Sequence, residues 1–273
     1  AAFPLVLVHN REEEFSREAT DVQQDDSGIV AAWDKEAGGT WMGLHAKSGR
    51  LMALTNVRTK HLPPVDRASR GKMVKDYLAG LPAEPKDSFF AYHSFLVEDA
   101  FSTSQGFWFQ SSTPEPSDSG VEWSTRREPI PVGVVSGCSN EIASNLGEDM
   151  WPKTRWLVDQ VGRILHQQGE NRSQEEESMH DLLNRLGEVL SMVVEFEQDQ
   201  LPDLSFTPLD KAEEARRQRG PFIPGVKGYG TQCQTVVLRS AEKNTLYYCY
   251  RRTINVPGSE LGHVPWTIHR IHH

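Results

Sequence analysis

The sequence predicts a single domain of the α+β class, in which antiparallel sheet lies between helices. Apolar runs typical of strands come first, two amphipathic helices follow, and another pair of strands comes near the end. The links between the early strands have hairpin lengths, which argues against the alternating order of a parallel sheet. A chain of 273 residues allows one large or two small domains. No linker divides the apolar patterns, so we expect one domain over residues 1–273.

The first half of the chain is predicted to form short strands between turns. Apolar runs place these strands at residues 3–10, 28–33, 89–97, 106–110 and 130–135. Glycine-containing turns before residues 41 and 51 predict a hairpin across residues 40–56. The Ser/Pro/Asp-rich segment 111–120 predicts an exposed loop.

Three segments have the apolar spacing of helices. The first begins after Ser69, a residue suited to an N-cap, and runs to residue 78. Residues 151–166 and 179–196 each carry an apolar stripe, which predicts two helices packed side by side on one sheet. The polar, charged connector 167–177 between them is expected to be flexible.

The last part of the chain predicts one more hairpin. Residues 211–219 are dense in charge and are expected to lie in solvent. Apolar strands follow at residues 235–239 and 245–252, with Asn244 in the turn between them.

Composition excludes several functions. The net charge of −9 opposes binding to nucleic acid or to an anionic membrane surface. No apolar run is long enough to span a membrane, so we expect no stable membrane insertion. Three cysteines, Cys138, Cys233 and Cys249, are an odd number and too widely spaced for a zinc site, which favours a reducing, cytoplasmic compartment. No phosphate-binding or metal-ligating motif is present, and we expect no cofactor and no metal.

Four short segments in a fixed order carry the most specific signal. They are residues 10–13 (NREE), 38–43 (GGTWMG) with 53–56 (ALTN), 137–140 (GCSN) and 228–231 (GYGT). With the segments SRG at 69–71 and WPK at 151–153, they resemble the transport and Golgi organisation protein 2 family, also called the NRDE family. The resemblance extends over residues 4–250, almost the whole chain.

This resemblance implies a fold and a chemistry. The family looks like the N-terminal nucleophile hydrolases, whose fold is a four-layer αββα sandwich of two antiparallel sheets between helices. In such enzymes an N-terminal Cys, Ser or Thr attacks an amide carbonyl, and its own α-amine is the base. The family's candidate nucleophile is a Cys directly after the initiator Met. The present chain begins at Ala1, nine residues before Asn10, and alanine has no nucleophilic atom.

The resemblance also assigns roles to individual residues. Arg11 would hold the nucleophile and lower its pKa, and Glu12 stands where the family has Asp. Asn140 would donate to an oxyanion. These three residues are the catalytic candidates. Asn10, Trp41 and Asn56 are the substrate-binding candidates. Gln232 stands where the family usually has Arg.

Each assignment has a structural alternative. Arg11 and Glu12 could form an ion pair at the strand end, and Asn140 could cap a turn. Trp41 could pack in the core, and Cys138 could be a small buried apolar residue. The catalytic interpretation predicts that four residues converge at one end of the sandwich: Arg11, Glu12, Asn56 and Asn140.

Two functions therefore stay open. The first is an amidohydrolase that cleaves a small acyl-amide with an N-terminal Cys absent from this chain. The second is a non-catalytic protein that carries a small or lipidic ligand, with acyl-CoA and haem as the candidates that the resemblance implies. The resemblance adds an association with mitochondria or the Golgi to the expected cytoplasmic location.

Overall fold

A computed structural model describes ten segments of the chain, and the following sections concern these residues: 2–61, 68–81, 89–102, 106–118, 120–141, 150–168, 175–197, 220–225, 228–254 and 262–273. They form an α+β fold with two antiparallel sheets, of five and seven strands, and with three helices in the described part. The predicted fold class is confirmed.

The described contacts divide the chain into two compact units. The terminal unit contains Ala1–Ser16 and Trp151–His273, and the central unit contains Arg17–Met150. Each unit combines one antiparallel sheet with its own helix or helices, which is the content of one half of an αββα sandwich. That the units together form one domain over residues 1–273 stays a prediction.

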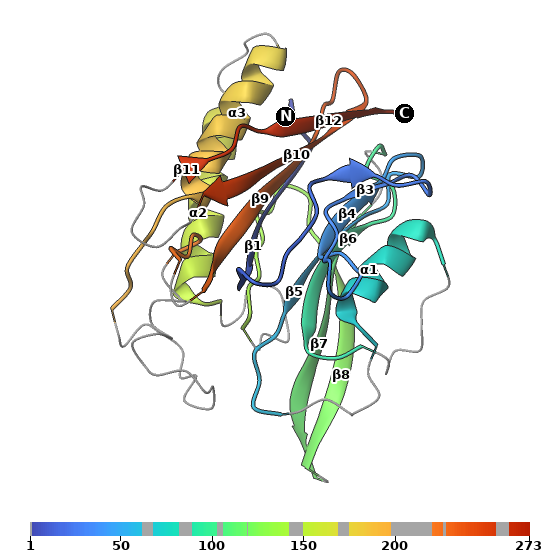
Figure 1. Cartoon of the computed structure of the whole chain (residues 1–273), viewed down its shortest axis with the longest axis vertical. Coiled ribbons are helices and arrows are strands. Elements are labelled where there is room, and N and C mark those ends of the chain that lie inside the picture. The colour runs from blue at the N-terminus through green and yellow to red at the C-terminus, as the bar shows by residue number, and fades with distance from the viewer. Residues whose placement is uncertain are drawn as a thin grey trace. The chain divides into compact units, whose positions relative to one another are not determined.

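The terminal unit is built on a five-stranded sheet (Figure 1). Its strands are β1 (Leu5–Glu14), β9 (Tyr229–Arg239), β10 (Thr245–Ile254), β11 (Gly262–His263) and β12 (Thr267–His272). Strand β9 lies between β1 and β10, and both β11 and β12 pair with β10. The predicted last hairpin is confirmed, with Asn244 at a positive φ of 45° in its turn.

Two helices cover one face of this sheet. Helix α3 (Glu175–Leu190) contacts β1 and β9, and α2 (Pro152–Gln168) contacts α3. The apolar stripe of α3 is fully buried at Leu182 and Leu186. The two helices lie side by side, as predicted. Helix α3 ends at Leu190, earlier than the predicted residue 196, because Ser191 and the following residue turn back to the carbonyls three positions before them.

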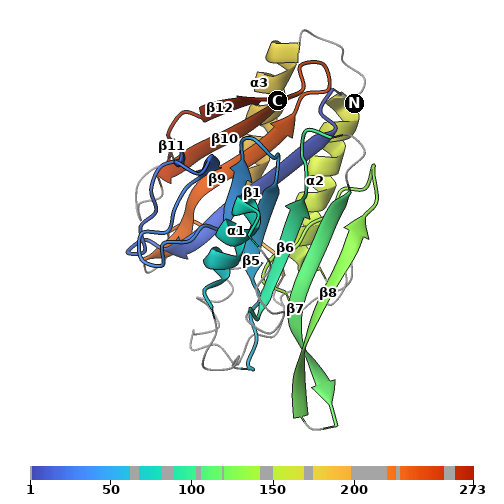
Figure 2. The ribbon, with the colours of Figure 1, turned by 90° about the vertical axis from the view of Figure 1, so that its right-hand side faces the viewer.

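The central unit is a seven-stranded antiparallel meander (Figure 2). Its strands are β2 (Gln23–Gln24), β3 (Ile29–Ala31), β4 (Met42–His45), β5 (Leu51–Asn56), β6 (Tyr92–Val97), β7 (Phe107–Ser117) and β8 (Gly120–Ile130). Helix α1 (Arg70–Ala79) packs on β4 and β5 through the buried side chains Val74 and Leu78. The predicted hairpin across residues 40–56 and the helix after Ser69 are confirmed.

Two predictions in this unit are wrong. The segment 111–120 is not a loop, because β7 continues to Ser117 and β8 begins at Gly120. Proline is tolerated in a strand where its missing N–H would point away from the ladder, so Pro114 does not end β7. The predicted strand 130–135 is absent, because Ile130 is the last residue of β8 and residues 131–135 do not form a strand. They turn after β8, with a bond from Val134 N–H to the Pro131 carbonyl and with Gly133 at a φ of 84°.

Some predictions fall on residues outside the described part. These are the charged segment 211–219 and residues 169–174 of the connector, whereas residues 175–177 belong to α3. In the described segments no helix combines the length and the apolar character needed to cross a membrane.

Candidate functional site

The predicted catalytic residues of the terminal unit lie at an irregularity in its sheet. In the ladder between β1 and β9, Arg11 pairs with Cys233 but Glu12 pairs with Thr231. Gln232 is therefore the extra residue of a β-bulge. Bulges bend a strand and re-aim its side chains, and they are common beside functional sites.

Arg11 and Glu12 have different partners. Successive side chains of a strand point to opposite faces, so the two residues cannot share one face of the sheet. Glu12 is on the side of the helices, where Lys153 Nζ of α2 lies 3.2 Å from its Oε2. The Lys153 side chain is 6% exposed and the Glu12 side chain 14%. The buried ion pair of Glu12 is thus with Lys153 and not with Arg11.

Arg11 is buried on the other face of β1. Its guanidinium donates to Oε1 of Gln232, the residue at the bulge. The Gln232 amide in turn donates to the Glu14 carbonyl at 2.6 Å. A glutamine can accept from Arg11 and donate to the backbone at once, which an arginine at position 232 could not do, because arginine has no acceptor.

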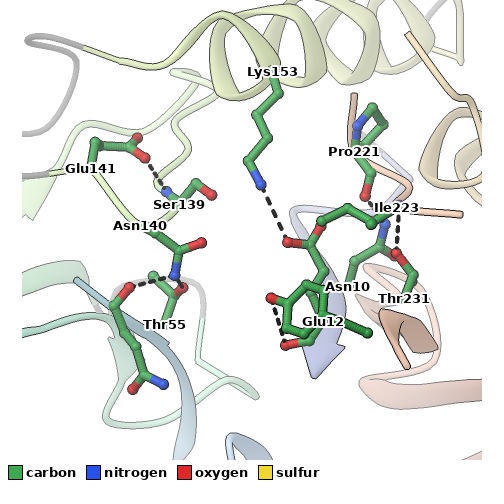
Figure 3. A network of polar contacts seen from close by, with 12 residues as sticks. Asn10, Glu12, Thr55, Ser139, Asn140, Glu141, Lys153, Pro221, Ile223 and Thr231 are labelled. Carbon is green, nitrogen blue, oxygen red and sulfur yellow. Dashed lines mark hydrogen bonds and ion pairs between the residues drawn. The ribbon is translucent and has the colours of Figure 1, made fainter. Parts of the chain in front are cut away.

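Asn10 ties the strand to the end of α3. Its Nδ2 donates to the carbonyl of Leu190, the last residue of the helix, at 2.9 Å, and also to the carbonyl of Pro221. The final carbonyls of a helix have no partner within the helix, and Asn10 satisfies one of them. Figure 3 shows Asn10 beside Pro221, and Lys153 reaching Glu12.

In the central unit, the predicted donor Asn140 lies against the end of β5. Its Nδ2 donates to the Asn56 carbonyl at 2.5 Å and contacts Thr55 Oγ1 at 3.5 Å (Figure 3). Its own carbonyl accepts from the Arg58 N–H at 2.9 Å. The structure therefore brings the two candidates Asn56 and Asn140 together, and the amide of Asn140 holds the backbone of β5.

A buried histidine fixes the same segment. His93 is fully buried on β6, and its Nε2–H donates to the Glu141 carbonyl at 2.7 Å. Burial lowers the pKa of His93 to about 4, although the hydrogen bond from the ring opposes this shift. The Glu141 carboxylate accepts from the Ser139 N–H at 2.9 Å. The end of the GCSN segment and the residue after it are thus anchored at three successive positions, 139–141.

The glycines around Trp41 serve the packing of α1. A Cβ on Gly39 would lie 2.6 Å from the backbone carbon of Gly71, at the start of that helix. The Thr40 N–H also donates to the Gly71 carbonyl at 3.3 Å. Trp41 itself is half-buried, and its carbonyl accepts from the Leu54 N–H. The segments GGTWMG and SRG therefore meet through their backbones.

None of the three thiols in this chain is activated. Burial raises the pKa of Cys233 to about 11 and that of Cys249 to about 12. Burial also raises the pKa of Cys138, and the nearby Glu141 carboxylate raises it further. All three cysteines are free. Among the described residues no group of three or more His, Cys, Asp or Glu side chains could hold a metal ion.

The candidates thus form two separate groups. Asn10, Arg11 and Glu12 belong to the terminal unit, whereas Trp41, Asn56 and Asn140 belong to the central unit. Convergence of all these residues on one site stays a prediction. Lys153 was not among the candidates, although a buried carboxylate at Glu12 requires a partner and WPK was one of the matching segments. No pattern in the sequence indicated His93.

Comparison with known proteins gives a family match. The family model described as Transport and Golgi organisation 2 matches residues 1–253. No curated protein and no solved structure matches the chain.

Proposed function

This chain belongs to the transport and Golgi organisation 2 family, and we propose that it binds and carries a small or lipidic ligand without hydrolysing it. The observation that carries this proposal is that side chains predicted to be catalytic bind other groups of the protein. Glu12 is paired with Lys153, and the amide of Asn140 holds the Asn56 carbonyl. Groups that bind the protein's own structure in this way support a scaffold role over a chemical one.

The thiols support the same conclusion. A cysteine nucleophile reacts as the thiolate and needs a lowered pKa, from a nearby cation, a helix N-terminus or a base. Burial instead raises the pKa of Cys138 and Cys233, and the charge of Arg11 only partly offsets this for Cys233. Neither thiol is suited to attack an amide at neutral pH.

Arg11 gives the proposed carrier its ligand chemistry. A buried guanidinium offers a rigid fork of N–H donors that matches a carboxylate or phosphate group. Acyl-CoA carries phosphates and haem carries carboxylates, so both suit the arginine in β1. We propose Arg11 as the anion-recognising residue of this chain.

An amidohydrolase with an N-terminal nucleophile hydrolase-like fold is the second candidate. Two observations favour it: each unit contains one sheet with its helical layer, and the bulge at Gln232 re-aims the residues around Arg11. This function requires an N-terminal Cys in addition to the thiols of this chain, with Arg11, Glu12 and Asn140 in the catalytic roles.

Titration of the protein with a long-chain acyl-CoA and with haem tests the proposal. We expect saturable binding of at least one of them, weakened about tenfold or more in Arg11→Met, because one charged contact to an anion is lost. Arg155→Met is the matched control on an exposed face of α2 and should bind as the wild type does. Failure of both ligands to bind, or equal binding by Arg11→Met, would contradict the proposal. Circular dichroism checks that each variant is folded.

We propose a cytoplasmic location with association to mitochondria or the Golgi. The three free cysteines support a reducing compartment. The acidic net charge argues against a nucleic-acid partner. Fractionation of cells expressing the tagged protein would test this, and recovery from a secreted fraction would contradict it.

A further inference from the structure

The outer edge of β8 is open in the described part of the chain. Strand β8 is the last of the seven strands in its sheet and pairs only with β7 there. It is 11 residues long, and Val121 on it is 39% exposed. Ser112 pairs with Tyr92, the first residue of β6, and beyond Ser112 β7 pairs only with β8. The two strands therefore continue as a two-stranded ribbon beyond β6 (Figure 2). A long open edge is a template for another strand.

Prolines determine which edge of this ribbon can accept a strand. In an antiparallel pair, every second residue directs its backbone N–H and C=O groups towards the partner strand, and the residues between direct theirs outward; each of these two sets is called a phase here. Pro114 and Pro116 on β7 and Pro129 on β8 belong to the same phase. Because proline cannot donate to a ladder, this phase must direct its backbone groups outward. The outer edge of the β7 extension therefore lacks two donors, which blocks pairing there.

The same phase leaves β8 able to pair. Opposite residues share a phase, so Val121, Trp123, Thr125 and Arg127 direct their backbone N–H and C=O groups outward. Four alternate residues are enough for a short ladder, and it ends at Pro129. The open edge thus has defined limits and a defined hydrogen-bonding phase.

We propose that two copies of this chain associate by antiparallel pairing of their β8 strands around Ser124. In this register the outward backbone groups of Val121 and Arg127 meet those of Arg127 and Val121 in the second copy. Glu122 lies directly opposite Arg126 of the second copy, and the two-fold axis repeats this pair. Opposite charges at such close positions stabilise antiparallel pairs.

Charge selects this register over its neighbours. An axis at Thr125 would place Glu122 opposite Glu128 of the second copy. An axis at Arg126 would place the two Arg126 side chains opposite each other. Like charges directly opposite destabilise a sheet, and an axis at Trp123 gives no charge pair. The register around Ser124 has two complementary pairs and no like-charged pair.

The ion pairs that Arg126 and Arg127 form within one chain are compatible with this pairing. Arg126 forms an ion pair with Glu115 of β7 at 2.5 Å, and its side chain is 45% exposed. A guanidinium has donors for more than one carboxylate, so Arg126 can keep its bond to Glu115 and also donate to Glu122 of the second copy. Arg127 points to the other face, where it contacts Glu98 and the Trp108 ring.

Sedimentation velocity on the full chain tests this proposal with a charge exchange. We expect a dimer whose dissociation constant rises about tenfold or more in Glu122→Arg and in Arg126→Glu, because each places like charges in both pairs. A mixture of the two variants should recover the dimer, since every pair between unlike copies is again Arg opposite Glu. Arg126→Glu also loses the contact with Glu115 inside its own chain. Mixing the variants does not restore that contact, so its loss cannot explain a recovered dimer.

Three results would overturn the proposal. The first is a wild type that stays monomeric up to about 200 µM, a concentration that covers weak specific interfaces. The second is a dimer that neither charge reversal weakens. The third is a mixture of the two variants that fails to recover the dimer. A backbone variant gives an independent check. Thr125→Pro removes an outward donor without removing a bond to β7, and it should abolish the dimer while the circular dichroism spectrum is retained.

Discussion

Lys153 in the first turn of α2 forms a buried ion pair with Glu12 near the end of β1. Its ammonium also lies 5.8 Å from the centre of the Trp151 ring. The motifs NREE and WPK, which are about 140 residues apart in the chain, therefore meet in the terminal unit, and their contact fixes α2 to the edge strand of its sheet.

Removing one partner of this pair should be costly. We expect Lys153→Met to lower the free energy of unfolding by about 3 kcal/mol, because it leaves the Glu12 carboxylate buried without its cation. Urea denaturation measures the change. The double variant Glu12→Gln/Lys153→Met should recover much of this loss, since neither charge remains. A double variant no more stable than Lys153→Met would contradict the account of the pair.

Asn140→Ala separates the structural role of this residue from a catalytic one. Loss of the bond to the Asn56 carbonyl should lower stability by about 1–2 kcal/mol. Ser139→Ala is the neighbouring control, because Ser139 reaches the Glu141 carboxylate through its backbone N–H. Unchanged stability of Asn140→Ala would contradict the structural role and support an oxyanion donor.

Gly39→Ala tests the backbone contact between the GGTWMG and SRG segments. A Cβ at 2.6 Å from the Gly71 backbone forces α1 to move, so we expect a loss of about 2 kcal/mol or more in thermal or urea denaturation. At Gly106 the nearest atom to an added Cβ is 3.4 Å away, and φ is not in the left-handed region. Gly106→Ala should therefore change stability little, and equal effects at the two positions would contradict the contact.

His93 makes stability depend on pH in the acid range. Its pKa is about 4 in the folded state and about 6.5 when unfolded. As the pH falls from 6.5 towards 4, the unfolded chain binds a proton that the folded chain excludes. This group should thus lower stability by up to about 3 kcal/mol across that window, and no further below it.

NMR of the His93 ring provides the measurement. The ring should stay neutral, with the proton on Nε2, at pH 5, and the slope of stability against pH should be smaller in His93→Gln. A ring that titrates near pH 6.5 would contradict the assignment.

Local patterns predicted most elements of the fold, and the failures have physical reasons. The apolar stripes predicted α2 to within two residues at each end, and they predicted α3 at 179–196 where the helix is Glu175–Leu190. The turn at Asn244 was also predicted. The β7–β8 hairpin was missed because a Ser/Pro-rich segment is typical of loops. Proline in a strand is allowed only in one phase of the ladder, which no single-strand pattern reveals.

The candidate site was less predictable because its contacts are distant in the chain. The motif residues Asn10 and Asn140 indeed make polar contacts, but with the carbonyls of Leu190 and Asn56. The bulge at Gln232 depends on the register between β1 and β9, which a local pattern does not contain. Likewise, Lys153 becomes the partner of Glu12 only once α2 lies beside β1.

Turnover of an acyl-amide panel, measured alongside acyl-CoA binding, tests the central claim most directly. A nucleophile, its base and an oxyanion donor act as a unit, and the three thiols of this chain all have a raised pKa. The account predicts saturable binding of the acyl-CoA and no turnover by the chain that begins at Ala1. Amide hydrolysis by this chain that disappears in Cys138→Ser would contradict the account and make Cys138 the nucleophile.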